Sequence, residues 1–401
     1  MGELSPVNRA YAESDLKHIA EKEGPGMDML DINCLLRSSR DVDPEIVSLA
    51  REFAGAAGAK RRYALGRNEH AEALSQTVEL TGIVDDFAER GTTWRGKPVL
   101  KATELPADAI AVNCSMCTSP VSAARRLSQL NIAGVLSFAD LCRALPDRFR
   151  LPAFILETRR DIDLHAREWE QLSRSLADRE SRQVLHDVLR FRASGDYGVM
   201  SGYSVRPTDQ YFEQFLGLSD GEVFVDAGGF DGDTTEEFCR RYPGYRKVLL
   251  FEPSATNMER ARNRLRKLRD VEFFEMGLSD VPGHLSFNPD AGSASAIGGS
   301  YSHRVRTTTL DLEVQERVSF IKMDLEGWER KALEGTRYHI MQDAPRLAIA
   351  VYHSSLDFRR IFQFVVCLRS AYRVYLRHYT EGWSETVMYF VPEPEHGGGE
   401  G

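Results

Sequence analysis

The sequence VFVDAGGFDGDTTEEF, Val223 to Phe238, decides the fold of this chain. Its first residues form an apolar run that ends at Asp226 and predicts a buried strand. A glycine-rich turn follows, and then a segment in which Thr234 and Glu237 have capping-box spacing at the start of a predicted helix. Strand, turn and helix in this order are typical of the first crossover of a parallel α/β sheet.

The glycine turn also predicts a ligand site. Gly228 and Gly232 let the backbone approach a ligand because they carry no Cβ atoms, and the predicted helix offers free N–H groups. The turn lacks the GxGxxG spacing, however, and Asp226, Asp231 and Asp233 flank it. These carboxylates disfavour a pyrophosphate and favour a ligand that carries an ammonium or a sulfonium.

An acid ends the next predicted strand. The segment RKVLLFEPS places Glu252 at the carboxyl end of this strand. A carboxylate there can accept hydrogen bonds from both hydroxyls of an unphosphorylated adenosine ribose. Each motif alone is also consistent with a tight connection or a helix cap, but within one βαβ unit the two motifs reinforce each other.

Four further strand segments complete the predicted sheet of this second domain. VSFIKMDLEGWERKALEG indicates a strand that leads into Asp324 and Glu326, followed by a helix that Gly335 would cap. APRLAIAVYHSS indicates another strand, which ends at His353, and YRVYLRHYT with SETVMYFVP indicates an antiparallel hairpin. Because the carboxyl ends of parallel strands face the ligand crevice, we expect the two carboxylates to face the reaction zone.

These motifs resemble those of the FkbM family of S-adenosylmethionine-dependent methyltransferases. The resemblance rests on VDAGGFDGDT, FEPS, GLSD, IKMDLEGWERKALEG, AIAVYHSSLDF and YLRHYTEGWSETVMYFV, between Tyr211 and Val391. It implies an α/β fold of the class I methyltransferase type, with a mostly parallel Rossmann-like sheet and an antiparallel last hairpin. One departure is Phe230, where many methyltransferases have a glycine, and we expect it to reshape the loop on the methionine side without changing the cofactor.

The resemblance also implies the cofactor, S-adenosyl-L-methionine, and the residues that bind it. These are Asp226, Gly228 and Gly232 on the methionine and ribose side, Glu252 at the ribose hydroxyls, the chain around Leu278 at the adenine, and Asp324 near the methyl group. The usual reaction of the family is O-methylation of a hydroxyl on a sugar, a polysaccharide unit or a natural product.

Such a transfer needs an acceptor oxygen in line with the methyl group and a base that removes its proton. We expect His353 to be this base, because imidazole titrates near neutral pH, with Asp324 and Glu326 orienting it or the acceptor. His378 is the second candidate. A structural role stays open for each histidine, and a divalent cation held by Asp324 and Glu326 is the less favoured alternative.

The first part of the chain indicates a smaller parallel α/β domain. Strand-like and helix-like segments alternate between Arg61 and Leu145, with GTTWRGKPV as a turn, and RDIDLHAREWEQLSRSLADRESRQVLHDVLRFRAS predicts one or two connecting helices. We therefore expect five regions. They are a helical or irregular arm at 1–45, a small Rossmann-like domain at 46–165, a helical linker at 166–210, the methyltransferase domain at 211–392 and a disordered tail at 393–401.

The small domain resembles the Rossmann-like domains that precede some sugar-modifying enzymes, through RRYALGRNEHAEAL, TGIVDDF and GKPVL. Its first turn contains Gly66 alone, where a phosphate-binding loop would be rich in glycine. We therefore favour a role in recognition or dimerisation, which would make the protein a homo-oligomer. Binding of a nucleotide sugar is the minority alternative.

Composition limits the partners. The chain has 401 residues, a formal net charge of -9 and a pI near 5.7, so nucleic acid and anionic membranes are disfavoured and a small-molecule or carbohydrate acceptor is favoured. Its six cysteines are spread along the chain, and Cys114 with Cys117 forms a single CxxC pair. We expect reduced, inert thiols. The first residues lack a signal peptide's apolar core, which predicts a cytoplasmic protein.

Two other classes of function stay open at this stage. A nicotinamide-dependent or nucleotide-sugar enzyme would use similar strand-end acids, but a GxGxxG turn is present in neither domain. A catalytically inactive module that only binds the cofactor is the other alternative. The combination of Asp324, Glu326 and His353 argues for an active enzyme.

Overall fold

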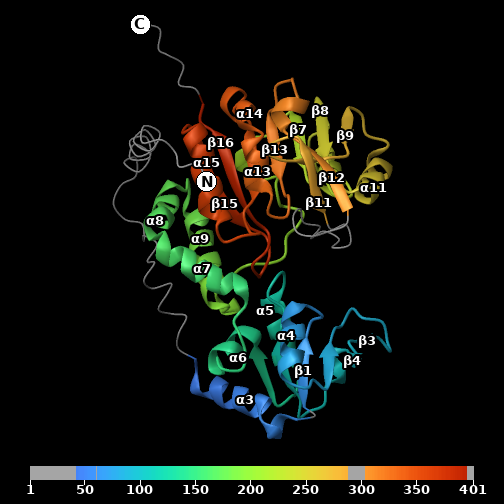
Figure 1. Ribbon diagram of the computed structural model, residues 1–401, viewed down its shortest axis with the longest axis vertical. Coiled ribbons are helices and arrows are strands. Elements are labelled where there is room, and N and C mark those ends of the chain that lie inside the picture. Colours follow the sequence, from blue (N-terminus) through green and yellow to red (C-terminus); the bar gives the residue numbers. More distant parts are fainter. Residues whose placement is uncertain (1–41, 60, 288–302, 395–401) are drawn as a thin grey trace.

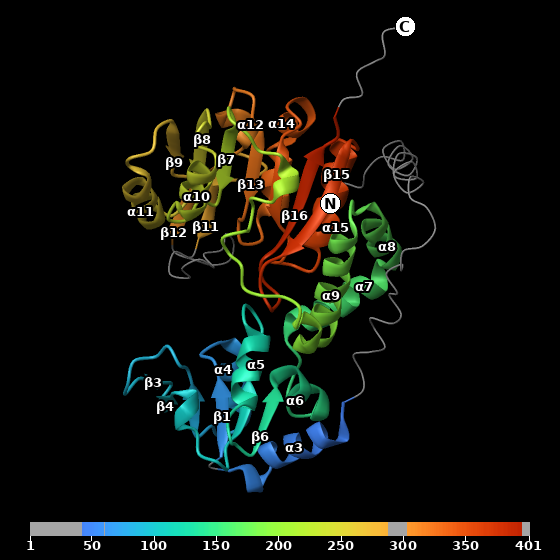
Figure 2. The same cartoon turned by 180° about the vertical axis from the view of Figure 1, so that it is seen from behind.

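The computed structural model describes residues 42–59, 61–287 and 303–394. Within them lie a seven-stranded sheet, a six-stranded sheet and a small three-stranded sheet. Figures 1 and 2 show the large sheet and the six-stranded sheet in separate lobes, with the helices α7, α8 and α9 beside the large one. The predicted N-terminal arm and C-terminal tail lie almost wholly outside the described residues.

The seven-stranded sheet has the order β15-β16-β14-β13-β7-β8-β9. All neighbours are parallel except the pairs β14–β16 and β15–β16, which are antiparallel, as the hairpin signal predicts. Its strands are β7 (Val223–Ala227), β8 (Lys247–Phe251), β9 (Val271–Phe274), β13 (Phe320–Met323), β14 (Arg346–Ala350), β15 (Tyr372–His378) and β16 (Thr386–Pro392). The chain crosses from one side of β7 to the other between β9 and β13, so the carboxyl ends of β7 and β13 border the crevice where ligands bind in such sheets.

Strand periodicity explains how this sheet is covered on both faces. Val223, Val225 and Ala227 belong to one core cluster and Phe224 to another, because successive side chains of a strand point to opposite faces. Phe224 packs against Phe238 with ring centroids 4.4 Å apart. The helices of this domain are α10 (Asp233–Arg241), α11 (Ala255–Leu265), α12 (Leu310–Glu313), α13 (Glu329–Glu334), α14 (Arg337–Gln342) and α15 (Asp357–Leu368).

The helix after the glycine turn starts earlier than the capping-box prediction, which was wrong. Gly232, with φ of 86°, is the N-cap of α10 and no side chain caps the helix there. Because the left-handed glycine already turns the chain into the helix, Thr234 lies inside the first turn. Glu237 instead accepts hydrogen bonds from Arg240 and Arg241.

Short elements complete this domain. The three-stranded sheet has the order β10-β12-β11, and its strand β10 contains Leu278, around which contact with the adenine is predicted. Its strands are β10 (Gly277–Leu278), β11 (Gly283–Phe287) and β12 (His303–Thr308), and two 3-10 helices, η3 (Tyr197–Met200) and η4 (Gln214–Leu216), precede β7.

The six-stranded sheet of the N-terminal domain has the order β3-β4-β2-β1-β5-β6, and its pairs are parallel except β3–β4. Its elements are α3 (Pro44–Ala54), η1 (Ala56–Gly58), β1 (Arg62–Leu65), α4 (Glu69–Thr77), β2 (Gly82–Val84), β3 (Thr93–Trp94), β4 (Lys97–Leu100), η2 (Ala102–Glu104), β5 (Ile110–Asn113), α5 (Pro120–Ser128), β6 (Gly134–Ser137) and α6 (Phe138–Ala144). The predicted parallel α/β layer is confirmed, whereas GTTWRGKPV is a short hairpin rather than only a turn. Arg95 and Gly96, both with positive φ, form its tip.

The connecting region contains three helices, α7 (Ala153–Leu164), α8 (Ala166–Ser175) and α9 (Arg179–Ser194), rather than one or two. They belong with the large sheet. Ala177 donates a backbone hydrogen bond to Val374 of the edge strand β15. The buried Arg359 of α15 forms an ion pair with Asp161 of α7 at 2.6 Å. None of the helices in the described residues is long and apolar enough to cross a membrane.

Candidate active site

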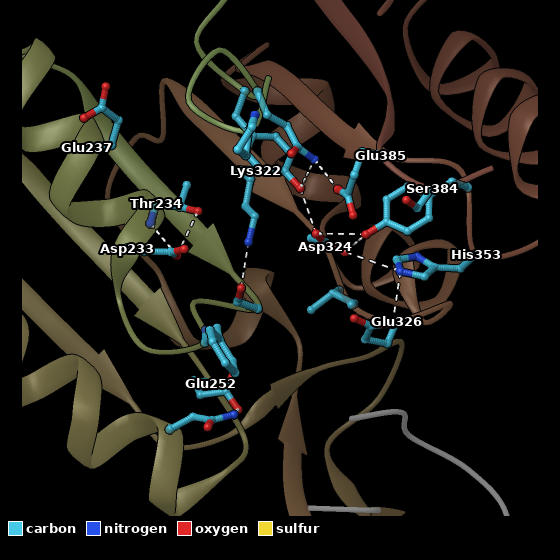
Figure 3. Close-up of a pocket in the computed structure, with 18 of the residues that line it drawn as sticks. Asp233, Thr234, Glu237, Glu252, Lys322, Asp324, Glu326, His353, Ser384 and Glu385 are labelled. Atoms are coloured by element: carbon cyan, nitrogen blue, oxygen red, sulfur yellow. Dashed lines mark hydrogen bonds and ion pairs between the residues drawn. The ribbon is translucent and has the colours of Figure 1, made fainter. Parts of the chain in front are cut away.

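A cavity of about 590 Å³ opens at the carboxyl ends of β7, β8, β13 and β14, a size typical of small-molecule sites. Both halves of the chain line it. The lining residues are Cys117, Pro207, Thr208, Gln210, Tyr211, Phe212, Gly228, Phe230, Asp233, Thr234, Glu237, Phe251, Glu252, Pro253, Asn257, Gly277, Lys322, Asp324, Leu325, Glu326, Tyr352, His353, Trp383, Ser384 and Glu385. Figure 3 shows Glu252 on one side of the cavity and Asp324, Glu326, His353 and Glu385 on the other.

Glu252 lies where a ribose-binding acid is expected. It directly follows β8, lines the cavity and is buried. Its Oε1 accepts the N–H of Ser254 at 2.8 Å and its Oε2 accepts the N–H of Phe230 at 3.0 Å. Oε1 also accepts a longer hydrogen bond from the side-chain amide of Asn257 at 3.4 Å. Oε2 keeps a free acceptor position, and a ligand hydroxyl can replace the long Asn257 bond at Oε1, so the residue can bind hydroxyls while it fixes the glycine turn.

Gly228 brings the chain unusually close to the next strand end. Its φ is 78°, and a Cβ atom added there would lie 1.9 Å from the backbone oxygen of Asp324. No side chain fits in that gap. The sequence therefore needs glycine here for both the left-handed backbone and the close approach of the two strand ends.

Lys322 is a site residue that the sequence analysis missed. Its Nζ lies 3.0 Å from Oδ1 of Asp226, and the two side chains are 3% and 0% exposed. The ammonium also donates to the carbonyl oxygen of Gly228 at 2.6 Å. Burial opposes the charged form, but the carboxylates of Asp226 and Asp324 outweigh it and raise the pKa of Lys322. The buried ion pair and this hydrogen bond thus fix the position of the glycine turn.

The predicted cofactor residues fall into two groups. Gly228, Glu252 and Asp324 line the cavity. Asp226 is wholly buried against Lys322, Gly232 caps α10, and Leu278 is in the core beside the lining residue Gly277. The residues of the second group therefore do not line the cavity but pack behind the residues that line it.

Two tyrosines hold Asp324 at the other side of the cavity. The Tyr211 hydroxyl donates to Oδ2 of Asp324 at 2.7 Å, and the Tyr352 hydroxyl lies 3.4 Å from the same carboxylate. Gln210 donates to the Tyr211 hydroxyl at 3.0 Å and to Oε2 of Glu385 at 2.7 Å. A continuous hydrogen-bonded chain therefore joins Asp324 to Glu385. The sequence analysis missed Gln210, Tyr211 and Glu385.

The surroundings of His353 do not suit a base. Its Nε2 lies 3.5 Å from Asp324 and 3.2 Å from Glu326, and its Nδ1 lies 3.0 Å from Glu329. Neither nitrogen makes an aligned hydrogen bond, so these are contacts between charges. Burial opposes protonation, but Glu329, Glu326 and Asp324 outweigh it and raise the pKa of His353 well above its ordinary value. An imidazolium has no lone pair for a proton, so this raised pKa argues against His353 as the base.

His378 lies outside the cavity lining. It is 1% exposed, its Nδ1 lies 2.9 Å from the Thr386 hydroxyl, and the Tyr203 ring packs edge-on against it. Burial lowers the pKa of His378 to about 3. The structure therefore gives this histidine the structural role, as a neutral member of the β15–β16 hairpin, and does not bring it to the reaction zone.

One group among the described residues has the spacing of metal ligands. Atoms of Asp324, Glu329 and His353 lie within 4.8 Å of one another. Glu326, which the metal alternative invoked, pairs with His353 instead. Oε1 of Glu329 already accepts the N–H of Leu325 at 2.7 Å and lies beside His353. These contacts describe an imidazolium that balances carboxylates, so the residues fit an internal ion pair better than a cation site.

Strained backbone is concentrated at the cavity. Seven non-glycine residues among those described have positive φ, namely Arg95, Tyr211, Phe230, Asp270, Glu326, Ala344 and Glu385. Four of them, Tyr211, Phe230, Glu326 and Glu385, line the cavity. Such strain persists where the surrounding structure fixes a functional geometry. Phe230 adopts the left-handed conformation, with φ of 45°, that a glycine would adopt without strain.

Comparison with solved structures supports the same fold for the whole chain. The methyltransferase FkbM from Methylobacillus flagellatus KT has a TM-score of 0.69 and 22% identity, over 96% of this chain and 100% of that chain. An rRNA methylase from Streptococcus thermophilus (TM-score 0.32, 18% identity) covers 45% of this chain and 93% of its own. Aeropyrum pernix fibrillarin with natively bound S-adenosyl-L-methionine (TM-score 0.30, 12% identity) covers 44% and 72%. No curated protein matches the sequence.

The sheet order and the match to a family model together identify an S-adenosylmethionine-dependent methyltransferase. Residues 226–395, most of the C-terminal domain, match the model of the methyltransferase FkbM domain.

Proposed function

We propose that the protein transfers the methyl group of S-adenosyl-L-methionine to a hydroxyl of a sugar, a polysaccharide unit or a natural product. The observation that carries this proposal is the continuous cavity between Glu252 and Asp324. Glu252 supplies the ribose-binding carboxylate at one end. Asp324 and the aromatic rings of Tyr352 and Trp383 border the space at the other end, where an acceptor ring has room to pack.

The charge of the lining favours an acceptor without phosphate. Six carboxylates line the cavity, from Asp233, Glu237, Glu252, Asp324, Glu326 and Glu385, against the cations of Lys322 and His353. An anionic acceptor would be repelled in this partly desolvated space, whereas the sulfonium of the methyl donor is attracted. A neutral hydroxyl compound therefore fits better than a nucleotide sugar or a sugar phosphate.

Titration calorimetry with S-adenosylhomocysteine tests the cofactor half of the proposal. We expect wild-type binding in the micromolar range and a loss of about tenfold or more in Glu252→Ala, because the hydrogen bonds to the ribose are lost. Glu259→Ala removes the same charge from the exposed face of α11 and should bind like the wild type. A folded wild type that does not bind would contradict the proposal.

The acceptor half is tested with S-adenosylmethionine labelled with carbon-13 in its methyl group. Free sugars, their phosphates and matched amino sugars are incubated with the labelled donor and the protein. The chemical shift of the product methyl distinguishes attachment to oxygen from attachment to nitrogen. Transfer to the neutral sugars in preference to their phosphates is expected, and methyl found only on nitrogen would overturn O-methylation.

A further inference from the structure

Glu385 is a carboxylate at the end of the cavity where Asp324 lies. It precedes β16, lines the cavity, and accepts a hydrogen bond at 2.7 Å from the neutral amide of the buried Gln210. Within the described part of the chain, Glu385 has no ion-pair partner. It therefore differs from Glu326, whose carboxylate faces the imidazolium of His353.

The other candidate bases of the cavity are already engaged. His353 is held as a cation by three carboxylates. Asp324 accepts the hydroxyl of Tyr211 and lies beside that of Tyr352, so its oxygens are already hydrogen-bonded. Among the described residues on the Asp324 side of the cavity, Glu385 is the carboxylate without an ion pair.

The N-terminal domain fixes the backbone just before Glu385. The Met116 carbonyl accepts the N–H of Trp383 at 3.1 Å, and the Cys117 carbonyl accepts that of Ser384 at 3.3 Å. Glu385 itself has a φ of 63°. Non-glycine residues keep such a conformation only where neighbouring contacts enforce it. Contacts between the two domains thus hold the carboxylate in place.

We propose that Glu385 accepts the proton of the acceptor hydroxyl during methyl transfer. The acceptor oxygen forms a bond to the methyl carbon as the carbon–sulfur bond breaks, and the electron pair of that bond stays on the sulfur. The hydroxyl proton passes to the carboxylate of Glu385, which makes the products S-adenosylhomocysteine and a methyl ether. This inference rests on the proposed function, because it needs an acceptor hydroxyl.

The protonation behaviour of Glu385 suits that role. Burial raises the pKa of Glu385 to about 7, and the nearby carboxylate of Asp324 adds to the shift. The hydrogen bonds from Gln210 and Tyr352 and the charge of His353 lower the pKa but do not offset this rise. A base is most effective when its pKa is close to the working pH. An ordinary glutamate, with a pKa near 4.3, would be a much weaker proton acceptor.

A base at the reacting oxygen must also lie close to the sulfonium, and this allows a test without the acceptor. A nearby cation favours the carboxylate form, so binding of S-adenosylmethionine should release a proton from Glu385. S-adenosylhomocysteine lacks the sulfonium and should release none. Calorimetric titration at pH 7 in buffers of different ionisation enthalpy measures the number of protons released on binding. The wild type is compared with Glu385→Gln and with the control Glu393→Gln, which changes an exposed glutamate directly after β16.

We expect Glu385→Gln to bind S-adenosylmethionine with about half a proton less released than in the wild type, since a group with a pKa of about 7 is half protonated at pH 7. The amino group of the ligand titrates in the same range and contributes equally to each variant. Equal proton counts in wild type and Glu385→Gln would overturn the proposal. Failure of both ligands to bind the wild type would instead overturn the proposed function.

Infrared difference spectra of the wild type keep the proposal testable if Glu385→Gln does not fold. The band of a protonated carboxyl group should lose intensity at pH 7 when S-adenosylmethionine is added, and should not change with S-adenosylhomocysteine. An unchanged band with both ligands would contradict the proposal.

Steady-state kinetics distinguish a catalytic base from a carboxylate that only lies near the reacting atoms. With a hydroxyl compound that the wild type methylates, we expect kcat of Glu385→Gln to fall by about 10²- to 10⁴-fold, with the KM for S-adenosylmethionine little changed. The wild-type kcat/KM for S-adenosylmethionine, which reports the free enzyme, should rise with pH up to about 7 and then level off, and this limb should disappear in the variant. A variant with wild-type kcat would exclude Glu385 as the base.

Discussion

Replacement of Gly228 by alanine is expected to abolish detectable binding of S-adenosylhomocysteine. The new Cβ atom would lie 1.9 Å from the backbone oxygen of Asp324 and 3.3 Å from Leu325, and the backbone has a φ of 78°. Neither neighbour can yield easily, because the Asp324 N–H is bonded to Ala227 at 3.1 Å and Leu325 is buried. The turn must therefore move away from β13, and the cavity is lost with it.

A matched glycine separates the clash from the cost of the backbone conformation. Gly221 has a φ of 85° and would place its Cβ atom in open space. We expect Gly221→Ala to lose about 1–2 kcal/mol of stability through its left-handed backbone and to keep wild-type affinity. Gly228→Ala should lose roughly 3 kcal/mol or more, because overpacking adds to the same strain. Thermal unfolding and calorimetric titration measure both effects, and wild-type affinity in Gly228→Ala would refute this account of the turn.

Local sequence signals predicted the sheet and the position of Glu252 in the cavity. Residues 223–227 alternate between the two cores, and the acid that follows residues 247–251 is in the expected place. Both properties depend on strand periodicity and on the rule that parallel strands end at one edge, which need no knowledge of distant contacts. For this reason, the sequence alone was enough to predict where the strands lie and where Glu252 lies.

The reaction end depends on contacts between residues far apart in the chain. Tyr211 and Asp324 are bonded across 113 positions, and Gln210 and Glu385 across 175. No motif marks such pairs in one sequence. The strand-end position of His353 predicts a base, but Glu329, the first residue of α13, supplies a carboxylate that only the folded chain brings to its Nδ1. This contact helps to raise the pKa of His353, which the local sequence does not reveal.

The N-terminal domain shows the same division between local and distant information. Its alternating strands and helices were predictable, and the single Gly66 in its first turn argued against a phosphate loop. Its contribution to the cavity was not predictable, because Cys117 reaches the lining through a loop after β5. All the described cysteines are free, and Cys114 is buried whereas Cys117 is exposed. Desolvation at the cavity still raises the pKa of Cys117. The residue is thus a wall of the cavity rather than a reactive thiolate.

Lys322→Met is expected to destabilise the protein by about 3–5 kcal/mol, because it leaves the carboxylate of Asp226 buried without its partner. The Gly228 carbonyl also loses the donor that holds it at 2.6 Å, so the affinity for S-adenosylhomocysteine should fall as well. Lys331→Met is the matched control. Its partner is Asp280, the Lys331 side chain is 48% exposed, and such surface pairs contribute about 0–1 kcal/mol.

The double variant Asp226→Asn with Lys322→Met identifies the cause of the loss. Asp226→Asn removes the buried negative charge that Lys322→Met leaves without a partner. The Asn side chain can still accept a hydrogen bond from the Thr235 hydroxyl, which donates to Asp226 at 2.8 Å in the wild type. We therefore expect the double variant to be more stable than Lys322→Met alone, as measured by urea unfolding followed through tryptophan fluorescence. Equal stability of the single and double variants would mean that lost packing, not an uncompensated charge, causes the destabilisation. In that case the glycine turn would be held by shape rather than by the ion pair behind it.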